Sequence, residues 1–202
     1  MIVTATSTSP RSTVRIWRWR VVDIVVAAVL GVASGVVFWA WGIAWTPLAN
    51  GLAFTPGLEG ILNGLWLFAG VLGGLVVRKP GAAVFVELVA AVTEAVIGSQ
   101  WGVTTLLSGV IQGLGAEIVF AILLYRVWSW WVAALAGAGA GLAEGILDSL
   151  LSVAALDPVA KTIYVASTIV SGALGGLLAW FAVRALARAG ALTRFAAGRP
   201  AR

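Results

Sequence analysis

Six long apolar segments, joined by short connections, constrain this chain more than any other feature of its sequence. They cover residues 21–45, 57–77, 81–98, 103–124, 128–150 and 160–184. A helix needs about 20 apolar residues to cross a bilayer, and inside the hydrocarbon only helices and closed barrels satisfy their backbone hydrogen bonds. With 61% hydrophobic and 10% charged residues, the chain is too apolar for a soluble domain. We therefore predict an all-α integral membrane protein whose six transmembrane helices form one bundle.

The basic residues predict the orientation of this bundle. Six spans place both chain ends on one side, and of the thirteen basic residues only Lys161 falls in a segment on the opposite side. Segments rich in Lys and Arg stay in the cytoplasm. We therefore predict a multi-pass plasma membrane protein with cytoplasmic termini: a basic tail over residues 1–20, a membrane domain over 21–184 and a second basic tail over 185–202.

The residue types that are missing exclude several kinds of site. The chain contains no cysteine and no histidine, so disulfides, thiolate metal sites and the usual imidazole ligands are ruled out. It also lacks the G-x-x-x-x-G-K-[ST] phosphate loop of an ATPase. Because the arginines lie beside the ends of apolar segments, they indicate topology and not nucleic-acid binding. We expect no catalytic residue, no metal and no cofactor in this chain.

Carboxylates inside the apolar spans are the main functional signal. Each costs about 2.5–3.5 kcal/mol at the bilayer centre, and no Lys or Arg within a span is available to pair with them. Such a group is either protonated, part of a proton or sodium path, or the counter-charge of a cationic ligand. For Glu59, Glu94 and Glu144, which fall in the outer half near aromatic residues, we favour ligand contact. For Glu87 and Glu117 we favour a structural role.

Polar and aromatic neighbours extend this candidate site. Glu144 and Asp148 share a helix face at spacing i, i+4, and Glu59, Asn63 and Trp66 form a second stripe at i, i+4 and i+7. Amide and indole groups next to carboxylates suit a flat, cationic ligand. An outer loop over residues 46–56 is expected to close over it. The predicted ligand-binding residues are Trp39, Glu59, Asn63, Trp66, Glu94, Gln100, Trp101, Gln112, Glu144, Asp148 and Tyr164.

Small residues follow one face of the first span at Ala27, Gly31 and Gly35. Small residues at four-residue spacing let helices approach closely. The stripe is equally suited to packing inside the bundle and to docking a second membrane subunit. Similar glycine pairs occur in the later spans, where internal packing is the favoured interpretation.

Two ordered stretches near the start of the chain resemble a known family. The run Arg18-Trp19-Arg20-Val21-Val22-Asp23-Ile24-Val25, followed by Gly31-Val32-Ala33-Ser34-Gly35-Val36-Val37-Phe38-Trp39, is similar to the start of the YkoE family, S components of energy-coupling factor (ECF) vitamin transporters. The similarity extends through the Glu94–Trp101 segment to the glycine-rich fifth span.

The resemblance implies a membrane subunit that captures thiamine, or a pyrimidine precursor, outside the cell. It further implies a transmembrane coupling subunit, two ATPase subunits that hydrolyse ATP, and docking through the Ala27, Gly31 and Gly35 stripe. Thiamine fits the acidic residues better than neutral hydroxymethylpyrimidine does, because its thiazolium ring is cationic. A stand-alone proton-coupled carrier of cationic aromatic compounds, titrating Glu87 or Glu117, is the alternative from another class.

Overall fold

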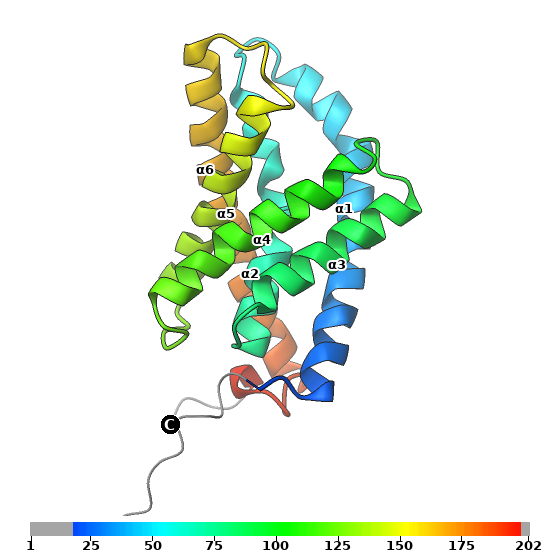
Figure 1. Ribbon diagram of the computed structural model, residues 1–202, viewed down its shortest axis with the longest axis vertical. Helices are drawn as coiled ribbons and strands as arrows, with labels where there is room; N and C mark the ends of the chain where they lie inside the picture. Colours follow the sequence, from blue (N-terminus) through cyan, green and yellow to red (C-terminus); the bar gives the residue numbers. More distant parts are fainter. Residues whose placement is uncertain (1–17, 199–202) are drawn as a thin grey trace, which may run out of the picture.

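The computed structural model describes residues 18–198, and within them all regular structure is helical. The elements are α1 (Val21–Gly51), η2 (Leu58–Leu65), α2 (Phe68–Val77), α3 (Ala82–Ile97), α4 (Thr104–Ile122), α5 (Trp130–Leu150), α6 (Pro158–Arg188) and η3 (Ala196–Gly198). They form one bundle, in which α3 and α4 run side by side and obliquely across the other helices (Figure 1). The predicted fold class is confirmed.

Five helical segments in the described part of the chain are long and apolar enough to cross a membrane. The remaining predicted span, residues 81–98, corresponds to α3, which has only 16 residues. At 1.5 Å per residue α3 is about 24 Å long, less than the hydrocarbon thickness of about 30 Å. Its short length fits its place inside the bundle, between α1, α2 and α4.

The structure moves one predicted boundary and divides one predicted span into two helices. Helix α1 continues past residue 45, through Pro47, and ends at Gly51, so most of the expected outer loop over residues 46–56 is helical. The second span is divided into the 3-10 helix η2 and the α-helix α2, with the break at Trp66 and Leu67. Such breaks are tolerated at membrane depth where neighbouring helices bury the backbone.

Helix α2 forms the centre of the bundle, and every residue from Ala69 to Val77 is buried. Glycines give its neighbours close access to the backbone. A Cβ on Gly74 would overlap the ring of Phe120 of α4, and one on Gly73 would overlap Val86 of α3. The core therefore depends on the small size of these residues.

The glycines of α5 and α6 bring these two helices into backbone contact. A Cβ on Gly137 would overlap the carbonyl oxygen of Gly172, and one on Gly176 would overlap that of Ala133. This is the internal packing that the sequence predicted for these pairs.

The small-residue stripe of α1 is likewise used inside the chain. Ala27, Gly31 and Gly35 are buried, and a Cβ on Gly31 or Gly35 would overlap side chains of α3 at Val89 and Thr93. In this chain the stripe therefore serves internal packing, whereas its docking to a coupling subunit stays a prediction. Sequence spacing could not separate the two outcomes, because both need the same smooth helix face.

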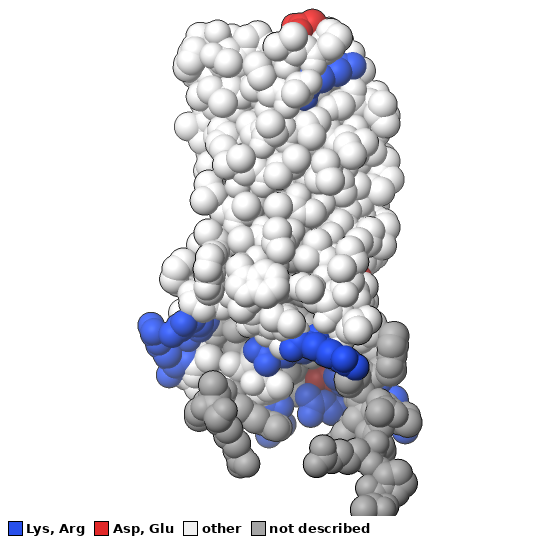
Figure 2. All heavy atoms as spheres, turned by 90° about the vertical axis from the view of Figure 1, so that its left-hand side faces the viewer, with Lys and Arg blue, Asp and Glu red and all other residues white. Residues whose placement is uncertain are grey.

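Basic side chains gather at the end of the bundle where the described chain begins and ends, and the flank above them carries almost no charge (Figure 2). There Asp23, which is fully buried, accepts hydrogen bonds from Arg20 and Lys79.

The predicted basic tails lie partly outside the described residues. Within these residues, α6 runs past position 184 to Arg188, and Leu192 and Phe195 pack into the core.

Candidate ligand cavity

A cavity of about 490 Å³ opens into the half of the bundle remote from the basic end. Every long helix of the bundle except α2 contributes to its wall, and so does η2. Its polar and aromatic lining residues include Trp45, Glu59, Asn63, Trp66, Glu87, Glu94, Trp101, Thr104, Thr105, Ser108, Gln112, Glu144, Asp148, Ser152 and Tyr164. This volume lies within the range of small-molecule sites, about 300–1,000 Å³.

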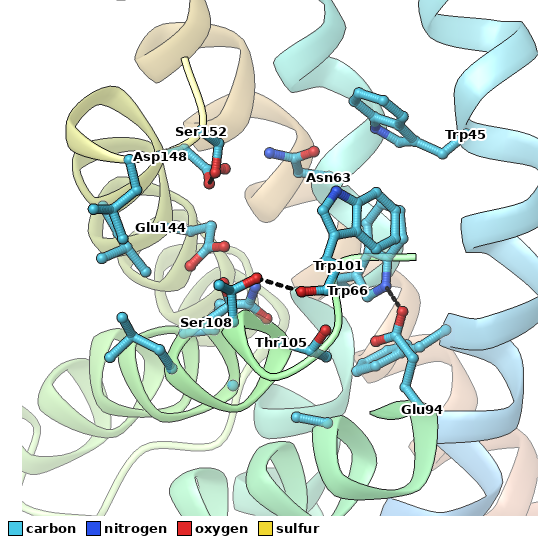
Figure 3. A pocket seen from close by; sticks show the side chains of 18 of the residues that line it. Trp45, Asn63, Trp66, Glu94, Trp101, Thr105, Ser108, Glu144, Asp148 and Ser152 are labelled. Atoms are coloured by element: carbon cyan, nitrogen blue, oxygen red, sulfur yellow. Dashed lines mark hydrogen bonds between the residues drawn. The ribbon is translucent and has the colours of Figure 1, made fainter. Parts of the chain in front are cut away.

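One wall of the cavity combines a carboxylate with three indole rings (Figure 3). The indole N–H of Trp66 donates to Glu94 Oε1 at 3.3 Å. The Trp101 ring stands edge-on to Trp66, with ring centroids 5.0 Å apart, and to Trp45, with centroids 5.7 Å apart. The negative faces of aromatic rings beside a carboxylate suit a flat or cationic group.

The opposite wall carries a second acidic cluster (Figure 3). Tyr164 of α6 donates its hydroxyl proton to Asp148 Oδ2 of α5 at 2.7 Å and accepts a hydrogen bond from Asn63 of η2 at 2.9 Å. Ser152 also donates to Asp148, at 2.7 Å. Glu144 lies one helical turn before Asp148 on the cavity side of α5.

Four buried polar atoms on residues that line the cavity have no hydrogen-bond partner among residues 18–198. They are Trp45 Nε1, Glu87 Oε1, Glu94 Oε2 and Glu144 Oε2. Buried polar groups in native proteins are almost always satisfied, so unpartnered ones need an explanation. In the part of the chain that the structure describes, no Lys or Arg lines the cavity. The wall therefore offers one donor and three acceptors to a ligand with cationic or hydrogen-bond donor groups.

The two carboxylates assigned a structural role differ in position. Glu117 accepts the backbone N–H groups of Gly81 and Ala83 at the start of α3, together with the hydroxyl of Tyr125 at 2.7 Å. Burial and this carboxylate raise the pKa of Tyr125, so the phenol stays protonated and donates. Glu87 accepts the N–H of Gly70 near the start of α2, but it also lines the cavity.

The structure brings nine of the eleven predicted binding residues to this cavity: Glu59, Asn63, Trp66, Glu94, Trp101, Gln112, Glu144, Asp148 and Tyr164. The other two, Trp39 and Gln100, instead line a side cavity of about 140 Å³. Glu94 and Trp101 line both spaces and so form the wall between them.

Several lining residues were not predicted, notably Trp45, Thr105, Ser108 and Ser152. Helical spacing contained a signal for two of them, because Ser108 precedes Gln112 by four residues and Ser152 follows the acidic pair on α5. For Trp45, which follows Trp39 and Trp41 in the same span, helical spacing contains no signal that separates it from these neighbours.

Comparisons with known proteins agree with this architecture. Residues 22–143 match a family model described as an ABC-type cobalt transport system, permease component. The chain is 35% identical over 185 residues to the HMP/thiamine permease protein YkoE of Bacillus subtilis (strain 168). The aligned region covers 90% of this chain and 91% of that protein. The chain belongs to the YkoE family. A crystal structure of an S component of an ECF transporter superposes with a TM-score of 0.84 at 34% identity, covering 90% of this chain and 92% of the other.

Membership of the YkoE family settles the general class of this chain. It is a multi-pass plasma membrane protein that functions in transport and not as an enzyme, and it has the S-component fold. The resemblance carried by residues 18–25 and 31–39, at the start of the chain and in α1, is thereby confirmed.

Proposed function

We propose that this YkoE-family protein is the substrate-capture S component of an ECF importer and that it binds thiamine in the 490 Å³ cavity. The observation that carries the proposal is the set of unpartnered polar atoms on its wall: three carboxylate oxygens and one indole N–H. A ligand that is cationic and aromatic, and that also carries hydrogen-bond donors and an acceptor, would satisfy all four.

Thiamine has this chemistry. Its thiazolium ring is permanently positive and suits the indole faces around Glu94. Its aminopyrimidine ring offers an amine donor and ring nitrogen acceptors, which suit the Glu144 and Trp45 groups. Because none of the described residues that line the cavity is Lys or Arg, the charged groups that a phosphate ester would meet there are carboxylates. The alternative ligand, hydroxymethylpyrimidine, is neutral and leaves the acidic residues without a counter-charge.

Metal ions fit the cavity less well. Cobalt and similar metals favour imidazole or thiolate ligands, and the chain has neither His nor Cys. In residues 18–198, no three acidic side chains come together closely enough to hold a metal ion. The residues present therefore favour an organic cation over the metal named in the family model.

As an S component, the chain would function with a transmembrane coupling subunit and two ATPase subunits, and the ATP would be hydrolysed by these partners. The absence of a phosphate-loop motif in its own sequence supports this division of labour.

Calorimetric titration of the purified protein with thiamine, hydroxymethylpyrimidine and thiamine phosphate tests the proposal. We expect saturable binding, strongest for thiamine and weakest for the phosphate. Absence of saturable thiamine binding would contradict the proposal. Uptake driven by a proton gradient in proteoliposomes containing this chain alone would favour the stand-alone carrier instead.

A further inference from the structure

The connection between α3 and α4, residues 98–103, forms the part of the cavity wall that carries Trp101. Its two glycines, Gly98 and Gly102, have φ angles of 123° and 59°. Few other residues adopt such angles, so both ends of the segment are places where the backbone can rotate at low cost. The glycines thus bracket a short segment that can move as a unit.

Gln100 fastens this segment to α1. Its side-chain amide donates to the carbonyl oxygen of Gly42 at 2.9 Å, and its amide oxygen accepts the hydroxyl of Thr46 at 3.2 Å. The residue was predicted to bind ligand, but it does not line the main cavity. Both of its hydrogen bonds instead join the α3–α4 connection to one face of α1.

Trp101, the next residue, separates two spaces. Together with Glu94 it lines both the ligand cavity and the 140 Å³ side cavity. The edge of its ring also packs against Gly42, where a Cβ would come within 3.2 Å of the indole. The side cavity gives the ring room to turn away from Trp45 and Trp66.

We propose that Gln100 is a latch: a positioning residue that holds Trp101 in the cavity wall, and whose release from Gly42 and Thr46 lets the ligand in and out. The inference rests on the proposed function only for the nature of the ligand. The movement proposed here is that of the α3–α4 connection, residues 98–103. One latch bond is exposed to solvent and the other only partly buried, so their loss is expected to change an opening equilibrium by about three- to tenfold.

A single introduced thiol measures this opening without any ligand, because the chain has no cysteine of its own. Thr105→Cys places the thiol on a buried cavity residue whose hydroxyl lies 3.0 Å from that of Ser99 in the latched segment. We expect Thr46→Val and Gln100→Leu to raise the rate at which a hydrophilic maleimide labels this thiol by about three- to tenfold. Thr46→Ser keeps the hydroxyl and is expected to leave the rate unchanged.

Ser171→Cys controls for general loosening, because Ser171 is buried against Gly60 between α6 and η2, away from the latch. The thiol of Ser171→Cys should be labelled at the same rate whether or not the chain also carries a substitution at Thr46 or Gln100. Equal rates at Thr105→Cys in every background, or an equal rise at Ser171→Cys, would overturn the latch.

Adding thiamine separates this inference from the proposed function. Protection of Thr105→Cys by thiamine is expected if the cavity binds it, and lack of protection would contradict the proposed ligand while leaving the ligand-free rates to decide on the latch. In stopped-flow tryptophan fluorescence, Thr46→Val should accelerate thiamine association and dissociation together. Faster dissociation alone would mean a lost contact in the bound state, and would count against the latch.

Discussion

The hydroxyl of Tyr164 lies 2.7 Å from Asp148 Oδ2 and joins α6 to α5 at the cavity wall. The same hydroxyl accepts the side-chain amide of Asn63 at 2.9 Å. Tyr164 therefore orients one acidic and one amide side chain that face the cavity, and the three residues come from three different helical segments.

Replacing Tyr164 by Phe separates the effect of its hydroxyl, which orients Asp148 and Asn63, from the effect of its ring, which fills space. Tyr164→Phe keeps the ring but removes the hydrogen-bond partner of Asp148 Oδ2 and of the Asn63 amide, at a cost of about 1–3 kcal/mol. We predict that thiamine affinity falls about five- to tenfold, measured by calorimetry. Tyr125→Phe removes a comparable 2.7 Å bond to Glu117 at the basic end, and it should lower thermal stability without changing affinity. Similar affinity losses in both variants would argue against a role at the site.

Glu94 should distinguish a cationic ligand from a neutral one. Glu94→Gln conserves shape and removes the charge beside Trp66 and Trp101. We expect thiamine affinity to drop about 10- to 100-fold, or about 1.4–2.8 kcal/mol, and hydroxymethylpyrimidine affinity to change less. The matched variant Glu117→Gln lies outside the cavity, so its titration should resemble that of the wild type. An unchanged thiamine affinity in Glu94→Gln would refute the counter-charge assigned to this residue.

Because the α1 stripe packs inside the bundle, enlarging one of its residues is expected to lower the stability of the isolated protein. A Cβ on Gly35 would come within 2.5 Å of the Ala90 carbonyl oxygen and of Thr93 Cβ in α3. We therefore expect Gly35→Ala to destabilise the purified subunit by about 1–3 kcal/mol, read as a lower unfolding temperature before any partner is added. Ala33→Leu, on the exposed face of the same helix, should leave that temperature unchanged. A Gly35→Ala protein of normal stability that fails only to assemble would restore the docking interpretation.

At the basic end, Lys79 and Arg20 share the buried carboxylate of Asp23. Lys79→Met removes one partner of a desolvated charge, and we expect the unfolding temperature to fall by several degrees. Ligand affinity should not change, because the cluster and the cavity occupy opposite ends of the bundle. Lys161→Met supplies the control, since Lys161 makes no ion pair within the described residues. Equal falls of the unfolding temperature in Lys79→Met and Lys161→Met would show that the ion pair with Asp23 makes no specific contribution to stability.

Sequence alone determined the class of this protein and most of its candidate site. Apolar length and charge distribution are properties of the chain itself, so they predicted the helical bundle and the gathering of basic residues at one end. Helical periodicity likewise placed Glu144 with Asp148 on one face, and both line the cavity. The family resemblance rested on the same local order of residues and was confirmed by the relatives.

Only the tertiary structure decided which faces meet. Gly31 and Gly35 could pack internally or dock a partner, and the position of α3 determined that they pack internally. Gln100 follows Glu94 closely in sequence, yet its amide turns to α1 while Trp101 turns to the cavity. Spacing along one helix specifies which side chains share a face, but not which neighbour covers it. That choice depends on how the helices cross, and it is settled by contacts between residues far apart in the chain.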